Sequence, residues 1–108
     1  MTTATTNLNY ANRYGYTDVT PYEVVRRISD KTIEVRRMDA TVDPSWKRDF
    51  VPGGFFGHTA NNESQKWIIT SNPENEVIRI RKTKRGWGFK GEQFNLSETP
   101  VYFYDFNF

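Results

Sequence analysis

Two neighbouring segments in the first half of the chain combine hydrophobic and charged residues in a pattern typical of strands. Residues 22–28 and 32–38 are both rich in Val, Ile and Arg, and apolar residues alternate with charged ones in the second. The Ser-Asp-Lys sequence at 29–31 is typical of a tight turn. Although Pro21 is also a legitimate first residue of a helix over 21–29, the β-branched content favours a strand. This pattern predicts a β-hairpin.

A second hairpin is predicted over residues 77–90, where Ile and Arg alternate before a Lys-Arg-Gly turn. Residues 66–70 predict a further short strand. The aromatic alternation at 101–108 predicts a closing strand that contributes to the core.

Two stretches lack any period. Residues 1–20 are rich in Thr, Asn and Tyr, which predicts an arm that is ordered only where it docks, anchored by Tyr10, Tyr14 and Tyr16. Residues 39–64 contain two Pro, three Gly and four aromatic residues. They predict one long aromatic loop, of a length usually associated with function or disorder, and the large rings argue against disorder.

Short strands with turn signals and hardly any helical pattern predict a mainly β protein. We expect a small antiparallel β-barrel or rolled sheet of about five to six strands. The 108 residues have the length of one domain, so a single domain over 1–108 is predicted. Since 16% of the residues are aromatic, rings must form much of the core.

Charge and cysteine content limit the possible roles. Residues 77–90 hold six of the fifteen Lys and Arg residues and no acidic residue, whereas the whole chain is only +2. A local grip on a compact anion is therefore favoured over broad coating of long DNA. Cysteine is absent, which excludes disulfides and thiolate chemistry. Neither membrane insertion nor export is predicted, and a cytoplasmic location fits best.

The basic hairpin is the leading candidate for function. Arg79, Arg81 and Arg85 would contact phosphate, and Trp87 would stack on a base. The alternative is a solvated strand face, because charge on exposed strands also protects sheet edges from aggregation. Arg36 belongs to a second basic set on the first hairpin, which would either bind phosphate or be neutralised by neighbouring Glu and Asp residues.

The glycine-rich part of the long loop is the second candidate. Its glycines allow backbone N–H groups to surround an anion, and His58 and Asn61 would hydrogen-bond a base or sugar. His58 is the only histidine, and a lone histidine is more often structural than catalytic or metal-binding. Paired carboxylates, nucleophile elbows and dinucleotide fingerprints are absent, so a non-enzymatic protein without cofactor or metal is expected.

The chain also resembles, over nearly its full length, a family of small uncharacterised proteins encoded by phages, prophages and other mobile elements. The resemblance rests on the segments YANRYGYTDVTPYEVVRRISDKTIEVRRM, FVPGGFFGHTANNESQKWIIT, VIRIRKTKRGWGF and YFYDFNF. It implies an accessory protein of the host cell cytoplasm that acts by binding, and it transfers no site residue.

Three functions are therefore open. The leading hypothesis is a binding protein for an anionic, ring-bearing ligand, either a nucleotide signal or nucleic acid, that counters host defence. The second is a protein-interaction or virion component that binds a host protein or assembles into a homo-oligomer. The third is a small hydrolase or nuclease that uses His58 with a nearby acid such as Asp49 or Glu63.

Overall fold

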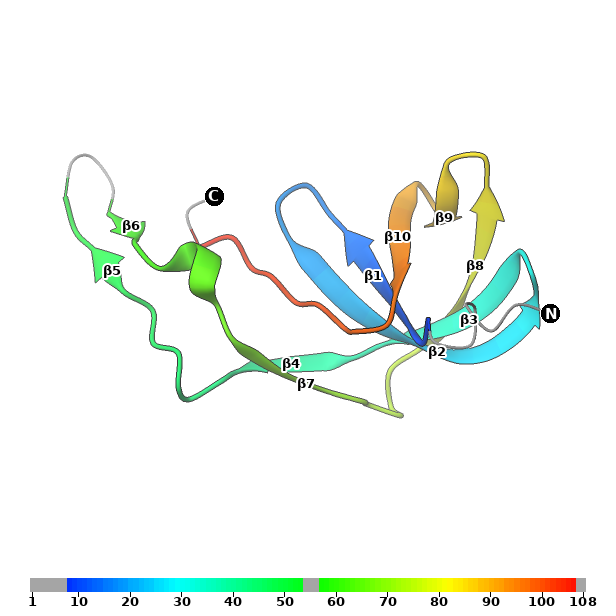
Figure 1. Cartoon of the computed structure of the whole chain (residues 1–108), viewed down its shortest axis with the longest axis horizontal. Helices are drawn as coiled ribbons and strands as arrows, with labels where there is room; N and C mark the ends of the chain where they lie inside the picture. The colour runs from blue at the N-terminus through cyan, green and yellow to red at the C-terminus, as the bar shows by residue number, and fades with distance from the viewer. Residues whose placement is uncertain (1–7, 54–56, 107–108) are drawn as a thin grey trace.

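Six antiparallel strands close into a barrel in the computed structural model, which describes residues 8–53 and 57–106 (Figure 1). Around the barrel the order is β1-β10-β9-β8-β3-β2. Barrel strands that follow one another in the chain pair with each other, and the pairing of β1 with β10 closes the barrel. The strands are β1 (Tyr10–Tyr14), β2 (Val19–Ser29), β3 (Thr32–Arg37), β8 (Val77–Thr83), β9 (Gly86–Phe89) and β10 (Glu92–Ser97). The predicted mainly β, antiparallel barrel is confirmed.

Both predicted hairpins are confirmed. The first is formed by β2 and β3, and the second by β8 and β9. Alternation decides which side chains face inward, because successive residues of a strand point to opposite faces. Ile33, Val35 and Ile80 are therefore buried, while Arg79 and Arg81 remain exposed.

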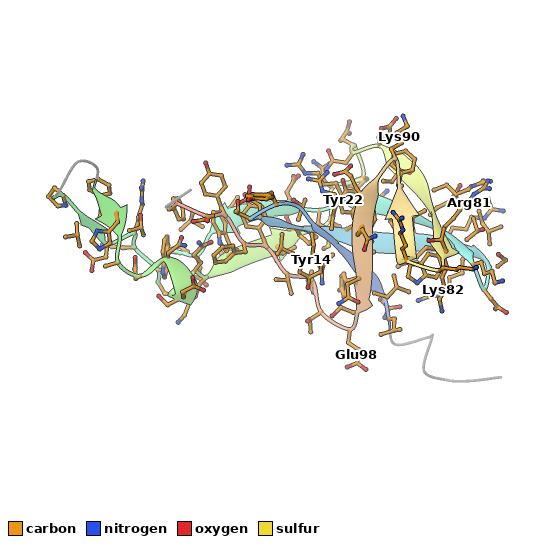
Figure 2. All side chains as sticks on the ribbon, turned by 90° about the horizontal axis from the view of Figure 1, so that it is seen from above. Tyr14, Tyr22, Arg81, Lys82, Lys90 and Glu98 are labelled. Carbon is orange, nitrogen blue, oxygen red and sulfur yellow. The ribbon has the colours of Figure 1, made fainter. Side chains whose placement is uncertain are left out.

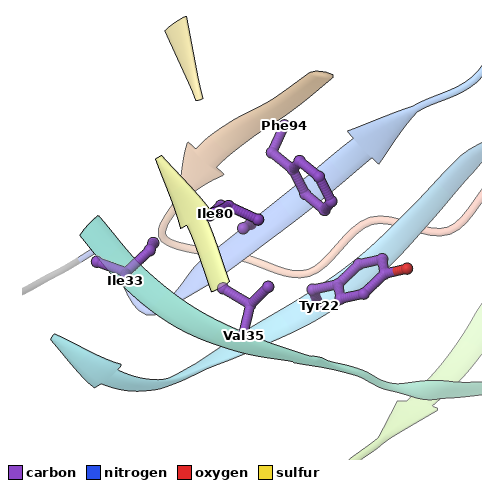
Figure 3. Packing of buried hydrophobic residues seen from close by; sticks show 6 residues of the cluster. Tyr22, Ile33, Val35, Ile80 and Phe94 are labelled. Carbon is purple, nitrogen blue, oxygen red and sulfur yellow. The ribbon is translucent and has the colours of Figure 1, made fainter. Parts of the chain in front are cut away.

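The barrel core combines aliphatic side chains with two rings (Figure 3). Tyr22 and Phe94 meet edge to face, with ring centroids 5.1 Å apart. Burial of each large apolar side chain contributes about 1.5–3 kcal/mol. The buried cluster consists of Ala11, Tyr22, Ile33, Val35, Ile80 and Phe94.

The predicted long loop over 39–64 is wrong in its described part, because this segment belongs to a structured arm inserted between β3 and β8. In the arm, β4 (Asp39–Val42) pairs with β7 (Trp67–Thr70), and the predicted strand at 66–70 is confirmed as β7. The outer part holds β5 (Phe50–Val51), β6 (His58–Thr59) and the 3-10 helix η2 (Asn62–Ser64). Elements this short leave little periodic signal in a sequence.

The predictions for the two ends of the chain are also corrected. Residues 10–14 form β1, an integral barrel strand, and not a docked arm; residues 1–7 lie outside the described part. Tyr14 and Tyr16 are exposed, so burial does not anchor them. The strand that closes the barrel is β10 at 92–97 and not 101–108, of which residues 107–108 are not described.

Residues 98–106, which we call the strap, run outside the barrel and then along the arm (Figure 1). Asn12 of β1 holds the start: its Nδ2 donates to the carbonyl of Thr99, and its Oδ1 accepts from the amide of Val101. Further along, the Tyr102 ring lies 4.4 Å from that of Trp67 in the arm. The strap thus ties the arm to the barrel in a molecule measuring 54 × 28 × 27 Å.

Across residues 8–53 and 57–106, no helix has the length and apolarity required to traverse a lipid bilayer.

Candidate functional site

Two tight turns lie side by side at one end of the barrel. Antiparallel pairing of β3 with β8 places the turn at Asp30 and Lys31 next to the turn at Lys84 and Arg85. The amide of Lys82 donates to the carbonyl of Lys31 over 2.8 Å and joins the two turns. The Thr83 hydroxyl also accepts from the Arg85 amide, which orders the second turn.

This end of the barrel carries a dense set of cations, which we call the basic end. Figure 2 shows Arg81 and Lys82 far from the outer tip of the arm. Within the described residues none of the cations of the basic end forms an ion pair. They remain available to an anionic ligand. The basic end consists of Lys31, Arg81, Lys82, Lys84 and Arg85.

Two of the predicted phosphate ligands are neutralised. Arg79 forms a 3.1 Å ion pair with Glu34, and Arg36 forms one with Glu23. The ordinary ion-pair alternative for the first hairpin is therefore correct at Arg36. The unpaired positive charge of these two strands is therefore concentrated at the basic end and not in the middle of β3 and β8.

Glu23 of β2 is the centre of a small polar network that includes Arg36 of the neighbouring strand β3. Its carboxylate accepts hydrogen bonds from Ser71 and from the Arg36 guanidinium. Burial opposes ionisation of Glu23, but the two hydrogen bonds and the Arg36 charge outweigh it and lower the pKa of this carboxyl. We interpret the network as structural, because the Glu23 carboxylate neutralises the charge of Arg36.

A hollow of about 230 Å³ opens at the mouth of the barrel beside the basic end. Trp87 forms one wall: its side chain is partly buried and packs against the core, so it is a fixed ring surface and not a freely exposed one. The guanidinium of Arg27 is held at the rim by the Leu8 carbonyl, 2.8 Å away. The hollow is lined by Arg27, Ile28, Ser29, Asp30, Ile33, Trp87 and Leu96.

A second hollow, of about 370 Å³, lies between the two turns. Lys31, Lys82 and Lys84 line it together with Asp30 and Thr83. Asp30 lines both hollows, so they adjoin. A hollow with a tryptophan wall and several aliphatic lining residues therefore lies directly beside one lined by three lysines and one aspartate.

The structure does not bring His58 and Asn61 to the basic end. Both lie on the arm, whose outer part is at the opposite end of the long axis (Figure 1). Asn61 is structural, since its amide group binds the Lys47 carbonyl and the Asp49 amide. The glycine-rich part of the loop, as far as it is described, is therefore not part of a site at the basic end. Residues 54–56 of this loop lie outside the described part.

The arrangement around His58 does not support the hydrolase alternative. His58 is exposed and forms no ion pair with Asp49 or Glu63. Among the residues that the structure describes, no group of three or more His, Asp and Glu side chains is arranged to hold a metal ion.

Sequence reasoning missed Lys31, Ile33 and Leu96 as parts of the site. The missing step was strand register: pairing Ile33 with Ile80 brings the turn at 30–31 beside that at 84–85. The alternation in both segments contains this signal, but only once β3 and β8 are recognised as neighbours.

Comparisons of the chain with family models, with curated proteins and with solved structures found no match.

Proposed function

We propose that this protein is a non-enzymatic binding protein for an anionic ligand that carries an aromatic base, that is, a nucleotide or a nucleic acid. The observation that carries the proposal is the juxtaposition at the basic end. A hollow walled by Trp87 adjoins a hollow lined by three lysines that form no ion pair with any residue of 8–53 or 57–106. Nucleic-acid ligands combine these two features, a flat ring and a charged phosphate.

Each hollow suits one part of such a ligand. The 230 Å³ hollow lies below the usual 300–1,000 Å³ range of drug-sized pockets, so it suits a single ring system. Trp87 offers the stacking surface, and Ile33 and Leu96 supply apolar contact. Lys31, Lys82 and Lys84 line the adjoining hollow, and there they would bind the phosphate that the sugar of the same nucleotide carries.

The resemblance to phage-encoded accessory proteins supports a biological context for this role. In that context the protein sequesters a nucleotide signal or covers nucleic acid in the cytoplasm of the host cell, and so counters host defence. Binding alone suffices for this action.

Titration calorimetry with mononucleotides, cyclic nucleotides and short oligonucleotides tests the proposal at two salt concentrations. The variant K82Q/K84Q removes two charges from the basic end, and K47Q/K66Q removes two from the arm as a matched control. We expect roughly tenfold weaker binding for the first variant at low salt and no change for the second. Absence of binding to every probe at low salt would refute the proposed function.

Trp87→Leu tests the ring surface separately. Loss of stacking on one base costs about 1–3 kcal/mol, so we expect binding to weaken by about fivefold or more. Thermal unfolding of the same variant reports whether the barrel is intact. A folded W87L protein with unchanged affinity would exclude stacking on Trp87.

A second candidate function is contact with a protein partner through the arm. Val42, Phe50 and Ile68 of the arm are 44%, 51% and 44% exposed, and exposed apolar side chains on a projecting element suit an interface. Light scattering, with pull-down from nuclease-treated host lysate, tests it. A monomer that captures no protein would exclude this function.

A further inference from the structure

A third hollow, of about 300 Å³, lies over β9 next to the basic end. Gly86 and Gly88 alternate with Trp87 and Phe89 along this strand. Because the two aromatic side chains pack against the core, the two glycines occupy the outward positions. The outer surface of β9 therefore has no side chains, and the backbone forms the floor of a groove.

Cations lie at both ends of this groove. Arg85 lines the end next to the turn, and Lys90 lines the other end. Within the described residues neither forms an ion pair. The carboxylate that also lines the groove, Glu92, is held by Arg13 in a 3.0 Å ion pair. The groove thus carries a positive charge at each end.

The three hollows form one continuous surface. Asp30 lines both the mouth and the hollow between the turns, Thr83 lines that hollow and the β9 groove, and Trp87 lines the mouth and the groove. The continuous path runs from the apolar mouth, across the turns, along the glycine floor. It is too long for one nucleotide, because β9 alone extends about 13 Å at 3.3 Å per residue.

We infer that the ligand is a linear single strand of nucleic acid. One unpaired base occupies the mouth against Trp87, and the sugar-phosphate backbone crosses the turns and follows the groove between Arg85 and Lys90. This inference rests on the proposed function and narrows it from any nucleotide to a polymer. The mouth requires an unpaired base, so a duplex does not fit.

The path suggests a site of about four nucleotides, at the lower end of the site sizes of single-strand-binding barrels. Glycines suit such a path, since a backbone floor lets the ligand approach closely. A mononucleotide would fill the mouth and the adjacent phosphate hollow but leave the groove empty.

The test is a length series of oligothymidylates from one to eight nucleotides, titrated at low salt against the full chain. We expect affinity to rise at least tenfold from one to four nucleotides and to change little beyond. Equal affinity for thymidine monophosphate and the octamer would overturn this inference but leave the proposed function standing. Tighter binding of a cyclic dinucleotide or of duplex DNA would also overturn it. No binding of any probe would refute both.

The variant R85Q/K90Q tests the groove itself, with K47Q/K66Q as the control. We expect about tenfold weaker binding of the tetramer and a salt slope reduced by about 0.7 for each lost phosphate contact. The mononucleotide should lose less affinity than the tetramer, because Lys90 lies in the groove and outside the basic end. Unchanged binding of the tetramer by folded R85Q/K90Q protein would overturn the assignment of the groove.

Discussion

Among single residues, Glu23 of β2 links the barrel wall to the end of the arm through two partners. Its side chain is 15% exposed and carries the Arg36 ion pair together with the Ser71 hydrogen bond. Glu23→Gln removes the charge and leaves the Arg36 guanidinium partly buried without a counterion. We expect the free energy of unfolding to fall by about 1–3 kcal/mol, measured by urea denaturation at pH 7.

The matched control is Glu34→Gln. Its partner Arg79 is 50% exposed, and solvent screens such a pair, so the loss should stay below about 1 kcal/mol. If E34Q destabilised the protein as much as E23Q, the distinction between the buried and the exposed pair would be wrong.

The Glu23 network also predicts a pH dependence. Its folded-state pKa is lowered below the ordinary value of 4.5. A lowered pKa adds stability that is fully present above the unfolded-state pKa and is lost as pH falls through the folded-state pKa. The stability difference between wild type and E23Q should therefore shrink below about pH 4.5, as urea denaturation at a series of pH values would show. A difference that stays constant would contradict the role of the ionised carboxylate.

Asn12 is one of the residues that hold the strap on the barrel, together with Val19 of β2, whose amide and carbonyl pair with Phe103. Asn12 is 1% exposed and makes two hydrogen bonds to strap backbone, to Thr99 and from Val101. Asn12→Ala leaves those backbone groups without their partner, so we expect a loss of about 1–3 kcal/mol. Asn95→Ala is the control, because Asn95 lies opposite Asn12 in the β1–β10 ladder and is exposed. Equal losses in the two variants would contradict the prediction.

At the scale of elements, the strap stabilises the arm through stacked and edge-to-face rings. Tyr102 lies against Trp67, and Phe106 stacks on Trp46 with ring centroids 5.7 Å apart. Such pairs contribute about 0.5–1.5 kcal/mol beyond their burial.

We therefore expect Tyr102→Ala to speed amide hydrogen exchange in β4 and β7 at least several-fold and to leave β3 and β8 unchanged. Local opening of an element responds to the contacts of that element. Val101→Ala, which shortens an exposed strap side chain, serves as the control. Uniform acceleration over the barrel and the arm would show that the two unfold as one unit.

Some of the strands could be predicted from the sequence alone and others could not. β-Branched content identified β2, and alternation identified β3 and β8, because one face of each strand is buried in the core. Alternation at 101–106 led to the wrong prediction of a closing strand, because the aromatic residues that pack on the arm have the same spacing as the inward residues of a strand. β1 was missed, since its inward positions include the small Ala11 and the charged Arg13.

The candidate site was predictable in its charge but not in its shape. Arg81, Arg85 and Trp87 lie together at the basic end or its rim, as expected. The neutralisation of Arg36 and the separation of His58 both depend on strand register and on the arm, which a one-dimensional pattern does not contain.

At the scale of the whole molecule, the barrel and the arm are separable in principle. Register pairs Arg36 of β3 with Val77 of β8, so the two strands are adjacent where the arm begins. Continuing this register places Met38 opposite Asn75, so replacing residues 39–74 by Asn-Gly converts the insertion into a two-residue hairpin turn. We expect the shortened chain to retain cooperative unfolding by circular dichroism and to bind the oligothymidylate tetramer within about threefold of wild type.

The opposite result is equally informative. A shortened chain that folds but no longer binds would place ligand contacts on the arm. Since the arm and the basic end lie at opposite ends of the long axis (Figure 1), that outcome would contradict the proposed site.

The strap also affects how the protein reaches its folded state. The hydrogen bond from Asn12 to Thr99 joins residues 87 positions apart in the chain, and the β1–β10 ladder beneath it spans a similar separation. Closing so long a segment loses much chain entropy before any contact compensates for it. On a ribosome, β1 must wait until β10 has emerged, so the free edge of β1 stays open to other chains up to that point.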